Sequence, residues 1–358
     1  MIVRPTLYSA PGGDTTQIDM TAKYLRKLGI NVDIQLSGAK FDHHQYDLIH
    51  FFNIIRPDDI LPNISATTPY VVSTIFVDYS EYDQKVRGGK ASFVFNLMSA
   101  GRIEYTKALA RWIFNGDQIK SKYYLFFGHK KSIQKIAGGA KILLPNSNSE
   151  NNRLKKYLNQ DLPFKKVVNA IDIATFHDGI HSNLEYEDHV ICVGRIEGLK
   201  NQLNLIKALG GTKVQLTLIG KAAPNHQAYY DACKREASQF TNIHFLEHTN
   251  PDGLAAIYKA AKVHVLPSWF ETTGLSSLEA GVMGCNLVVT KKGDTEEYFK
   301  DMVNYCQPDD IESIRNAVLE AYQKPVDPLL KDYILKHYNW FQAAEQTLSA
   351  YKLILEAN

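Results

Sequence analysis

Short apolar runs alternate with helix-like segments along the whole chain, and this alternation limits the fold more than any other feature of the sequence. Continuous apolar strands between helices are typical of parallel sheets that helices cover on both faces. We therefore expect an α/β fold with a doubly wound parallel sheet in each half. The expected strands are Ile2–Tyr8, Val32–Leu36, Leu48–Phe52, Tyr70–Phe76 and Ile142–Leu144 in the first half, and His189–Val193, Val214–Ile219, Ile243–Leu246, Val263–Leu266, Leu287–Thr290 and Val303–Cys306 in the second.

The length of the chain indicates how these strands are divided. At 358 residues it exceeds what one ordinary hydrophobic core supports and suits two domains. We place the boundary near Val167–Thr175, after an expected helix at Ser149–Leu158. Residues 1–168 and 169–339 are then expected to form two Rossmann-like domains.

The stretch from Lys262 to Thr290 is a strand-loop-helix-strand unit that carries two acidic residues. Glu271 lies on the loop after the first strand, and Glu279 lies in the early turns of the helix that follows Gly274. Such a unit directs the free N–H groups of the helix toward the carboxyl edge of a parallel sheet, where anionic ligands bind. The two carboxylates would flank one anion at different depths, which favours a sugar-nucleotide site.

These residues resemble a known family. Glu271 and Glu279, in the context PSWFETTGLSSLEAGVMG, resemble the E-x7-E signature of retaining GT-B glycosyltransferases. Upstream, the segment VGRIEGLKNQLNLIKAL contains Arg195 and Lys200, which are similar to the Gly-Arg and Lys-Asn marks of the same family in the same order. Gly12-Gly13 and Asn169 to Asp172 are weaker marks. The chain is therefore identified as a member of the glycosyltransferase family 4-like enzymes (glycosyl transferases group 1).

The resemblance implies an architecture and a division of labour. The fold would be GT-B, with two Rossmann-like domains that face an interdomain cleft. Residues 1–168 would bind the acceptor, together with a final helix, 340–358, that crosses back to this domain. Residues 169–339 would bind the nucleotide sugar.

The resemblance also implies roles for individual residues. Arg195 and Lys200 would stabilise the departing diphosphate together with the helix N–H groups, and Glu271 would lie over the donor sugar. These three are the expected catalytic residues. The expected donor contacts are Gly13, Arg195, Lys200, Glu271, Thr273, Gly274, Leu275, Ser276 and Glu279, and the weaker acceptor or sugar contacts are Gly12 and Asp78.

Each acidic residue also has a simpler interpretation. Glu279 should accept hydrogen bonds from the ribose hydroxyls, although a carboxylate early in a helix also interacts favourably with the helix dipole. Glu271 alternatively caps the helix that follows it. The pair Asp309-Asp310 is expected to cap the helix Ile311–Tyr322 rather than bind a metal ion. We therefore expect no metal site and no cofactor beside the nucleotide-sugar donor.

The chain departs from the family at two places. Many relatives carry His-Asp after the strand that corresponds to Tyr70–Phe76, whereas this chain keeps only Asp78. The sugar contact is then either lost or supplied by Asp78 or His50, although His50 on an apolar strand is more typical of a core histidine. Thr273 and Ser276 replace the aromatic residue and the proline that are usual near Gly274, which implies an unusual choice of donor.

Residues 85–141 combine many basic residues with aromatic ones and contain only Glu104 and Asp117 as acids. This composition suits an anionic membrane surface or a lipid-diphosphate acceptor. The alternative is a solvated basic helix face whose aromatic residues point into the core. Nucleic acid is not an expected partner, because the net charge is only +2 and no binding module is evident. Without a signal peptide or spanning segment, we expect the cytoplasm, and for a membrane-binding chain the inner face of the plasma membrane.

The predicted function is that of a retaining, metal-independent hexosyltransferase that moves a sugar from a nucleotide-diphosphate sugar to a glycan or lipid-linked acceptor in cell-surface polysaccharide synthesis. The resemblance implies front-side attack with retention. Two alternatives stay open. One is a sugar-nucleotide epimerase of the same fold, which needs further acids and histidines in the cleft. The other is a non-catalytic sugar-nucleotide-binding protein, which the missing histidine favours.

Overall fold

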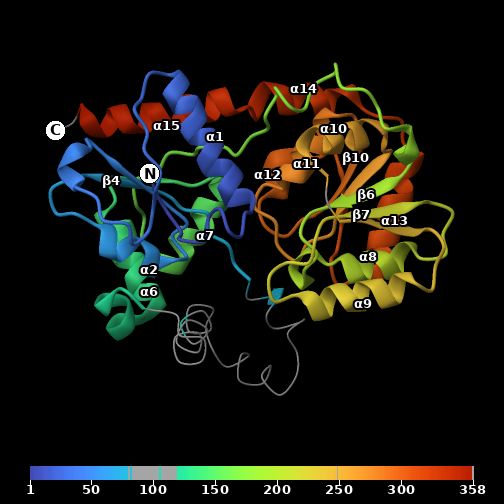
Figure 1. Cartoon of the computed structure of the whole chain (residues 1–358), viewed down its shortest axis with the longest axis horizontal. Helices are drawn as coiled ribbons and strands as arrows, with labels where there is room; N and C mark the ends of the chain where they lie inside the picture. Colours follow the sequence, from blue (N-terminus) through green and yellow to red (C-terminus); the bar gives the residue numbers. More distant parts are fainter. Residues whose placement is uncertain (80, 83–104, 106–118, 248, 357–358) are drawn as a thin grey trace. The chain divides into compact units, whose positions relative to one another are not determined.

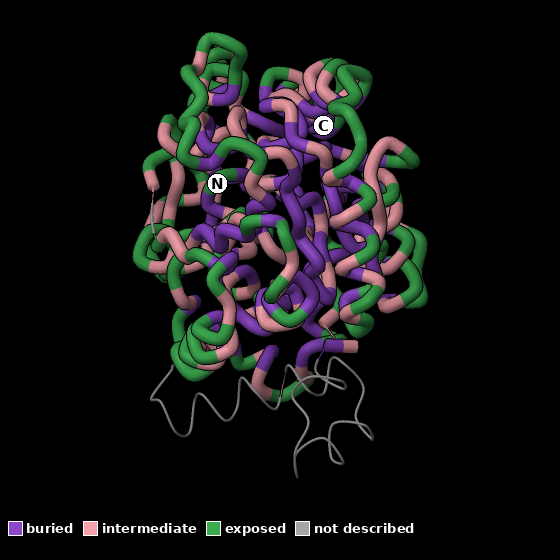
Figure 2. The backbone as a smooth tube through the Cα atoms, turned by 90° about the vertical axis from the view of Figure 1, so that its right-hand side faces the viewer, coloured by how far each residue is buried: buried purple, intermediate pink, exposed green. Residues whose placement is uncertain are grey.

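The computed structural model describes residues 1–79, 81–82, 105, 119–247 and 249–356 (Figure 1). The chain forms two compact units, of which the first comprises Met1–Asn169 and Trp340–Asn358 and the second comprises Ala170–Asn339. Buried residues lie mainly in the interior strands and on the inner faces of helices, and exposed residues lie mainly in the outer turns (Figure 2). Within the described residues, no helix combines the length and the apolar character that are needed to cross a bilayer.

The first unit contains a parallel sheet with the strand order β2-β1-β3-β4-β5. Its inner strands are completely buried, as expected for a sheet that helices cover on both faces. The strands are β1 (Ile2–Val3), β2 (Gln35–Leu36), β3 (Ile49–Phe52), β4 (Tyr70–Ser73) and β5 (Ile142–Leu144). All five strands predicted for this half are present, although β1, β2 and β4 are shorter than predicted.

Helices of the first unit come from both ends of the chain. The last helix, α15 (Trp340–Leu355), packs against α1 and β5, so residues near the C-terminus complete the N-terminal core. His50 of β3 reaches this helix, because its Nδ1 lies 2.7 Å from the Tyr351 hydroxyl. The other described helices of the unit are α1 (Gly13–Lys27), α2 (Pro57–Ile60), α6 (Lys122–Gly139) and α7 (Asn148–Leu158).

A buried carboxylate holds the segment that follows β4. Glu150 of α7 is fully buried, and its Oε1 accepts hydrogen bonds from the Thr74 hydroxyl and from the Phe76 N–H at 2.8 Å. Its Oε2 accepts from the Asn146 N–H at 2.8 Å. Between the first two donors lies Ile75 with φ +43°, a left-handed conformation that strains a β-branched residue. Glu150 therefore stabilises a strained turn at the carboxyl edge of the first sheet.

The second unit contains a parallel sheet with the strand order β11-β10-β9-β6-β7-β8. All six strands predicted for this half are present. They are β6 (Val190–Val193), β7 (Leu216–Ile219), β8 (Ile243–Leu246), β9 (Val263–Leu266), β10 (Asn286–Thr290) and β11 (Asn304–Cys306). The helices are α8 (Gln202–Leu209), α9 (Gln227–Ala237), α10 (Pro251–Ala260), α11 (Leu275–Val282), α12 (Thr295–Phe299), α13 (Ile311–Gln323) and α14 (Pro328–His337). Asp310 caps α13 by accepting from the Glu312 and Ser313 N–H groups, as predicted.

Replacing Glu150 with glutamine tests whether its carboxylate stabilises the strained turn at Ile75. The amide cannot accept at both oxygen positions, so one of the buried N–H donors faces another donor. We expect the variant to lose about 2–4 kcal/mol of unfolding free energy in a denaturant titration. Asp161→Asn removes an exposed acid of the same unit and should cost less than about 1 kcal/mol. Equal losses of unfolding free energy in the two variants would show that Glu150 does not stabilise the turn.

Candidate functional site

The order of strands in the second sheet changes direction between the neighbouring strands β6 and β9. These strands are neighbours, although β7 and β8 come between them in the sequence. From β6 the sheet grows one way through β7 and β8, and from β9 it grows the other way through β10 and β11. Open parallel sheets bind ligands at such a topological switch point, beside the carboxyl ends of the strands. Lys200 follows β6 and Glu271 follows β9, so these predicted site residues lie on either side of the switch point.

Lys200 and Glu271 form an ion pair across this point. The Lys200 Nζ lies 2.6 Å from the Glu271 Oε2, and the side chains are 20% and 11% exposed. The Ser268 hydroxyl donates to the same carboxylate oxygen at 3.1 Å. Charge-assisted hydrogen bonds of this length are stronger than neutral ones, and partial burial reduces their screening by solvent. The structure thus joins two motifs that are 71 residues apart in the sequence.

The backbone of Glu271 is fixed by the loop that follows β10. The Glu271 N–H donates to the Lys292 carbonyl at 3.0 Å, and the Asp294 N–H donates to the Glu271 carbonyl at 2.9 Å. Between these residues lies Gly293, with φ +106° and no room for a side chain. A Cβ at this position would lie 1.9 Å from the Glu271 carbonyl oxygen. Gly293 was not predicted as a site residue, and a lone glycine in KKGD carries little signal without the strand pairing.

Asn201 connects the loops around the switch point. It adopts a left-handed conformation with φ +63° between the short 3-10 helix Gly198–Lys200 and α8. Its side-chain amide donates to the Pro267 carbonyl at 3.1 Å and to the Pro308 carbonyl at 2.6 Å. These carbonyls belong to the loops after β9 and β11. Asn201 therefore orients the turn that presents Lys200.

Arg195 does not join the ion pair. Its guanidinium is half exposed and lies 3.2 Å from the Glu197 Oε1 on its own loop. Among the described residues, none of its hydrogen bonds reaches Lys200 or Glu271. The structure therefore brings Lys200 and Glu271 together and leaves Arg195 at the rim of the same loop.

The start of α11 lies against Glu271. Gly274 begins this helix with φ +68°, and a Cβ there would lie 3.4 Å from the Glu271 Cγ. The N–H groups of Ser277 and Leu278 donate to the Gly274 carbonyl, whereas those of Leu275 and Ser276 have no backbone acceptor among the described residues. Thr273 is buried, and in the described part of the chain its hydroxyl has no hydrogen-bond partner. Free N–H groups at the start of a helix are suited to bind an anion.

Glu279 lies deeper along α11 than this helix end. Burial raises the pKa of its carboxyl to about 8, and a hydrogen bond from the Tyr258 hydroxyl lowers that pKa. The Tyr258 hydroxyl lies 3.4 Å from the Glu279 Oε2. If Glu279 interacted only with the helix dipole of α11, it would not need a buried partner such as Tyr258. Tyr258 was not predicted as a site residue, because an apolar helix such as DGLAAIYKA gives no sign of where its hydroxyl points.

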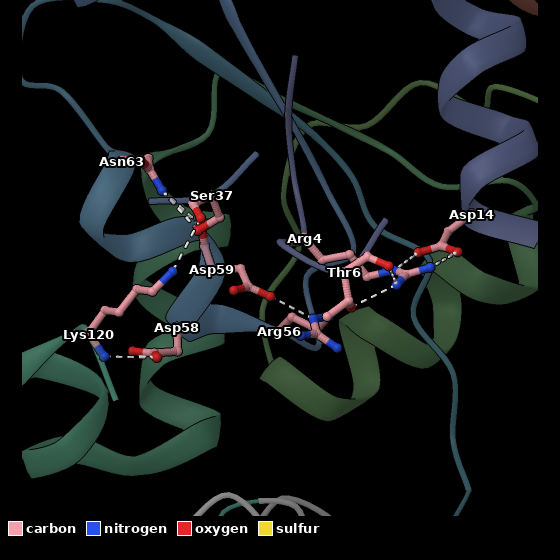
Figure 3. A network of polar contacts seen from close by, with 9 residues as sticks. All are labelled: Arg4, Thr6, Asp14, Ser37, Arg56, Asp58, Asp59, Asn63 and Lys120. Atoms are coloured by element: carbon pink, nitrogen blue, oxygen red, sulfur yellow. Dashed lines mark hydrogen bonds and ion pairs between the residues drawn. The ribbon is translucent and has the colours of Figure 1, made fainter. Parts of the chain in front are cut away.

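The first unit places Gly12 and Gly13 at its own switch point, between β1 and β3. Gly12 precedes α1, and its N–H donates to the Thr15 hydroxyl at 3.0 Å. The loop before it is held by Arg4, whose guanidinium binds the Asp14 carboxylate at 2.5 and 3.0 Å (Figure 3). The remaining guanidinium N–H groups donate to the Thr6 and Ala10 carbonyls. Arg4 therefore orients the glycine turn.

The two candidate sugar contacts near β3 and β4 differ in exposure. His50 is a core histidine, because both ring nitrogens are used: Nδ1 with Tyr351 and Nε2 with the Ser73 hydroxyl at 2.9 Å. Burial holds its pKa well below the ordinary value. Asp78 is exposed and follows the strained turn that Glu150 stabilises. Asp78 therefore stays a candidate contact, and His50 does not.

Comparisons with known proteins agree with this geometry. Residues 176–340, which include the switch point and α11, match the family described as glycosyl transferases group 1. Residues 176–340 therefore belong to the group 1 glycosyltransferases. The resemblance seen in the sequence is confirmed.

Curated glycosyltransferases match over part of this chain. An uncharacterized glycosyltransferase of Methanocaldococcus jannaschii is 28% identical over 181 residues, which cover 48% of this chain and 46% of the relative. O-antigen chain mannosyltransferase B of Escherichia coli is 24% identical over 181 residues, covering 48% and 47%. The matches thus span just under half the length of these relatives.

Solved structures match over the whole chain. Sucrose-phosphate synthase from Thermosynechococcus elongatus has a TM-score of 0.76 at 14% identity and covers 100% of this chain and 99% of that one. Anabaena HepE, in complex with UDP and glucose, has a TM-score of 0.68 at 15% identity and covers 98% of each chain. At these identities the likeness shows the fold alone. The predicted GT-B fold with two parallel-sheet α/β domains is confirmed.

Gly293→Ala tests how the loop after β10 holds Glu271. Gly284→Ala is a matched control, because both glycines have φ above +100° but only Gly293 would place a Cβ against backbone. We expect the control to cost about 1 kcal/mol of unfolding free energy and Gly293→Ala to cost about 2–4 kcal/mol. Chemical denaturation of both variants measures the difference. Equal costs would show that the Gly293 contact does not constrain Glu271.

Proposed function

We propose that this protein is a retaining, metal-independent glycosyltransferase that moves a hexosyl group from a nucleoside-diphosphate sugar to a glycan or lipid-linked acceptor. The observation that carries the proposal is the ion pair between Lys200 and Glu271 at the switch point of the second sheet, beside the start of α11. It places a cation, a carboxylate and a helix N-terminus next to one another. These three groups suit a ligand in which a diphosphate is joined to a sugar.

Lys200 and α11 would stabilise the departing diphosphate. A lysine ammonium has three N–H donors, of which Glu271 uses one in the unliganded protein, so two stay available for phosphate oxygens. The N–H groups of Leu275 and Ser276 add donors at the positive end of the helix. Arg195, at the exposed rim of the same turn, would bind the outer phosphate oxygens as a planar fork. These groups would take the place of a divalent cation.

Glu271 would act on the donor sugar without forming a covalent bond to it. Its Oε2 accepts from both Lys200 and Ser268, which neutralises the carboxylate charge and weakens it as a nucleophile. This supports front-side attack with retention. The acceptor oxygen forms the new bond to the anomeric carbon as the bond to the diphosphate breaks, and the acceptor proton passes to a diphosphate oxygen. Glu271 would orient the sugar hydroxyls and stabilise positive charge at the anomeric carbon.

The remaining predicted residues are assigned around this centre. Glu279 would accept from the ribose hydroxyls, and Gly13 and Thr273 would complete the donor site. Gly12 and Asp78 of the first unit would contact the acceptor or sugar. The nucleoside diphosphate is supported by HepE, whose structure contains UDP and glucose. A role in polysaccharide synthesis is supported by similarity to an O-antigen chain mannosyltransferase.

Substitutions at the ion pair test the proposed reaction. A thermal-shift panel of UDP-glucose, GDP-mannose and ADP-glucose selects the donor, and release of the nucleoside diphosphate is then followed with glycan and lipid-linked acceptors. We expect Lys200→Met and Glu271→Gln to slow transfer at least about 100-fold, since each removes charge stabilisation near the transition state. Lys207→Met, an exposed lysine of α8, is the matched control and should transfer normally.

The same assay separates the alternatives. Full transfer by either ion-pair variant would refute the assignment, and reversible loss of activity with a chelator would refute the metal-free mechanism. An epimerised donor formed without acceptor would indicate an epimerase. Nucleotide binding without turnover on any acceptor would indicate a non-catalytic binding protein.

We further propose that α6 contacts an anionic membrane, which would bring the protein to a lipid-linked acceptor. Residues 83–104 and 106–118 of the basic aromatic segment lie outside the described residues, but α6 is described. Its Phe126 and Phe127 are 77% and 51% exposed, whereas Tyr124 is buried. Lys131 lies 5.6 Å from the Phe127 ring, and no acid occurs between residues 118 and 149. Exposed aromatic rings beside lysines suit a membrane interface.

Vesicle sedimentation tests this contact. Phe126→Ser with Phe127→Ser should weaken binding to phosphatidylglycerol-containing vesicles at least about tenfold, because each exposed ring would contribute more than about 1 kcal/mol on insertion. Leu184→Ser with Leu329→Ser removes two exposed apolar residues of the second unit and should leave binding unchanged. Equal binding by the α6 variant, or equal binding to purely phosphatidylcholine vesicles, would contradict the proposal.

A further inference from the structure

Tyr258 is a buried tyrosine whose hydroxyl has one specific partner. It lies near the end of α10 and is 0% exposed. Its hydroxyl donates to the Glu279 Oε2 at 3.4 Å, and in the described part of the chain this is the only hydrogen bond that the hydroxyl makes. The pKa of the phenol is raised well above the ordinary value, chiefly by burial, so it stays a donor. A buried hydroxyl with a single carboxylate partner constrains that carboxylate.

We propose that Tyr258 is a positioning residue of the donor site, which fixes the Glu279 carboxylate by binding Oε2 and leaves Oε1 to accept hydrogen bonds from the ribose hydroxyls. This inference rests on the proposed function, because it assumes a ribonucleotide at the switch point. Among the described residues, no hydrogen bond is formed to the Glu279 Oε1. One oxygen of the carboxylate is therefore held by the protein, and the other is available to a ligand.

The backbone around Tyr258 is suited to this role. The Cys285 thiol donates to the Tyr258 carbonyl at 3.0 Å, which connects the end of α10 to the turn between α11 and β10. The ring packs between Phe176 and His264, with centroid distances of 6.1 and 5.9 Å. Fixed at both the carbonyl and the ring, the hydroxyl has little freedom to leave Glu279. A rigid support of this kind keeps a binding group in its productive orientation.

The hydrogen bond also affects the charge of Glu279. Tyr258 of α10 is the titratable side chain that acts on this carboxyl, and the neighbouring segments that pack on α11 also carry His264 of β9 and Cys285 before β10. His264 is neutral, because burial lowers its pKa to about 3, and burial raises the pKa of the Cys285 thiol. α14 also packs on α11, but none of its described charged groups acts on the carboxyl. Burial therefore raises the Glu279 pKa, and the hydrogen bond from the Tyr258 hydroxyl lowers it.

This opposition predicts a pH dependence. Ribose hydroxyls donate to the ionised carboxylate, so ribonucleotide binding should strengthen as the pH rises through the Glu279 pKa of about 8. Without the Tyr258 hydroxyl the ionised form loses a donor, and the pKa rises further. The midpoint of the pH dependence should therefore move upward.

Tyr258→Phe tests the inference, because it removes the hydroxyl and retains the ring. Calorimetry would compare the binding of UDP, GDP and ADP with that of their 2′-deoxy counterparts across the pH range. We expect the parent protein to prefer its best ribonucleotide at least about tenfold over the 2′-deoxy form, and the variant to lose most of this preference. The pH midpoint should rise by about half a unit or more. Carboxyl NMR of Glu279 in the unliganded proteins measures the same shift without a ligand.

Tyr338→Phe is the matched control. Tyr338 is also buried in the second unit, and its hydroxyl also makes hydrogen bonds of 3.4 Å, but to Tyr333 and the Glu297 carbonyl. The control should keep the ribose preference and the pH midpoint of the parent. A Tyr258→Phe variant that matches the parent or the control in both readouts would overturn the inference while leaving the proposed function intact. A parent protein that binds none of the three nucleotides would instead refute the proposed function and the ligand role of Tyr258 together.

Discussion

The ion pair between Lys200 and Glu271 joins two loops of the second unit that are far apart in the sequence. Its two residues come from loops after β6 and β9, which pair in the sheet but are separated by two strands in the sequence. A pair that is 20% and 11% exposed loses hydration on both partners, and good geometry with a further hydroxyl donor is needed to offset this cost. Such a pair is weak evidence of stability. It is better explained as a charge arrangement that a ligand completes.

Backbone constraints, rather than side-chain packing, place this pair. Asn201 is in a left-handed conformation, and its side chain donates to the carbonyls of two other loops. Gly293 has no side chain, so its backbone can lie in contact with the Glu271 carbonyl. Gly274 begins α11 in a left-handed conformation beside Glu271. Glycine adopts such conformations without steric cost and asparagine tolerates them, so the residue types at these three positions match the backbone that the loops require. The loops that carry Lys200 and Glu271 are thereby held in place by the parallel sheet.

The sequence predicted the framework of this protein better than the contacts within it. Apolar runs predicted the eleven strands of the described residues, because inner strands that are buried on both faces leave a continuous apolar pattern. Lys200 and Glu271 were found by motif, but their contact depends on the strand order, which no local pattern reveals. Gly293 and Tyr258 were missed because their roles arise only when distant segments meet. His50 could be interpreted either way until its two partners, Ser73 and Tyr351, were seen.

The two carboxylates of the Glu271–Glu279 motif are in opposite electrostatic situations, which suggests why the motif needs both. Glu271 is buried, and its carboxylate is bound by the Lys200 ammonium and the Ser268 hydroxyl. In the part of the chain that the structure describes, the Tyr258 phenol is the one donor to Glu279, and burial raises the pKa of this carboxyl to about 8. The first carboxylate can therefore respond to positive charge that develops during a reaction. The second is ready to accept neutral hydroxyl donors, whose hydrogen bonds offset the cost of its ionisation. A diphosphate bound beside Glu271 would meet a carboxylate whose charge Lys200 already offsets, which reduces the repulsion between the two anions.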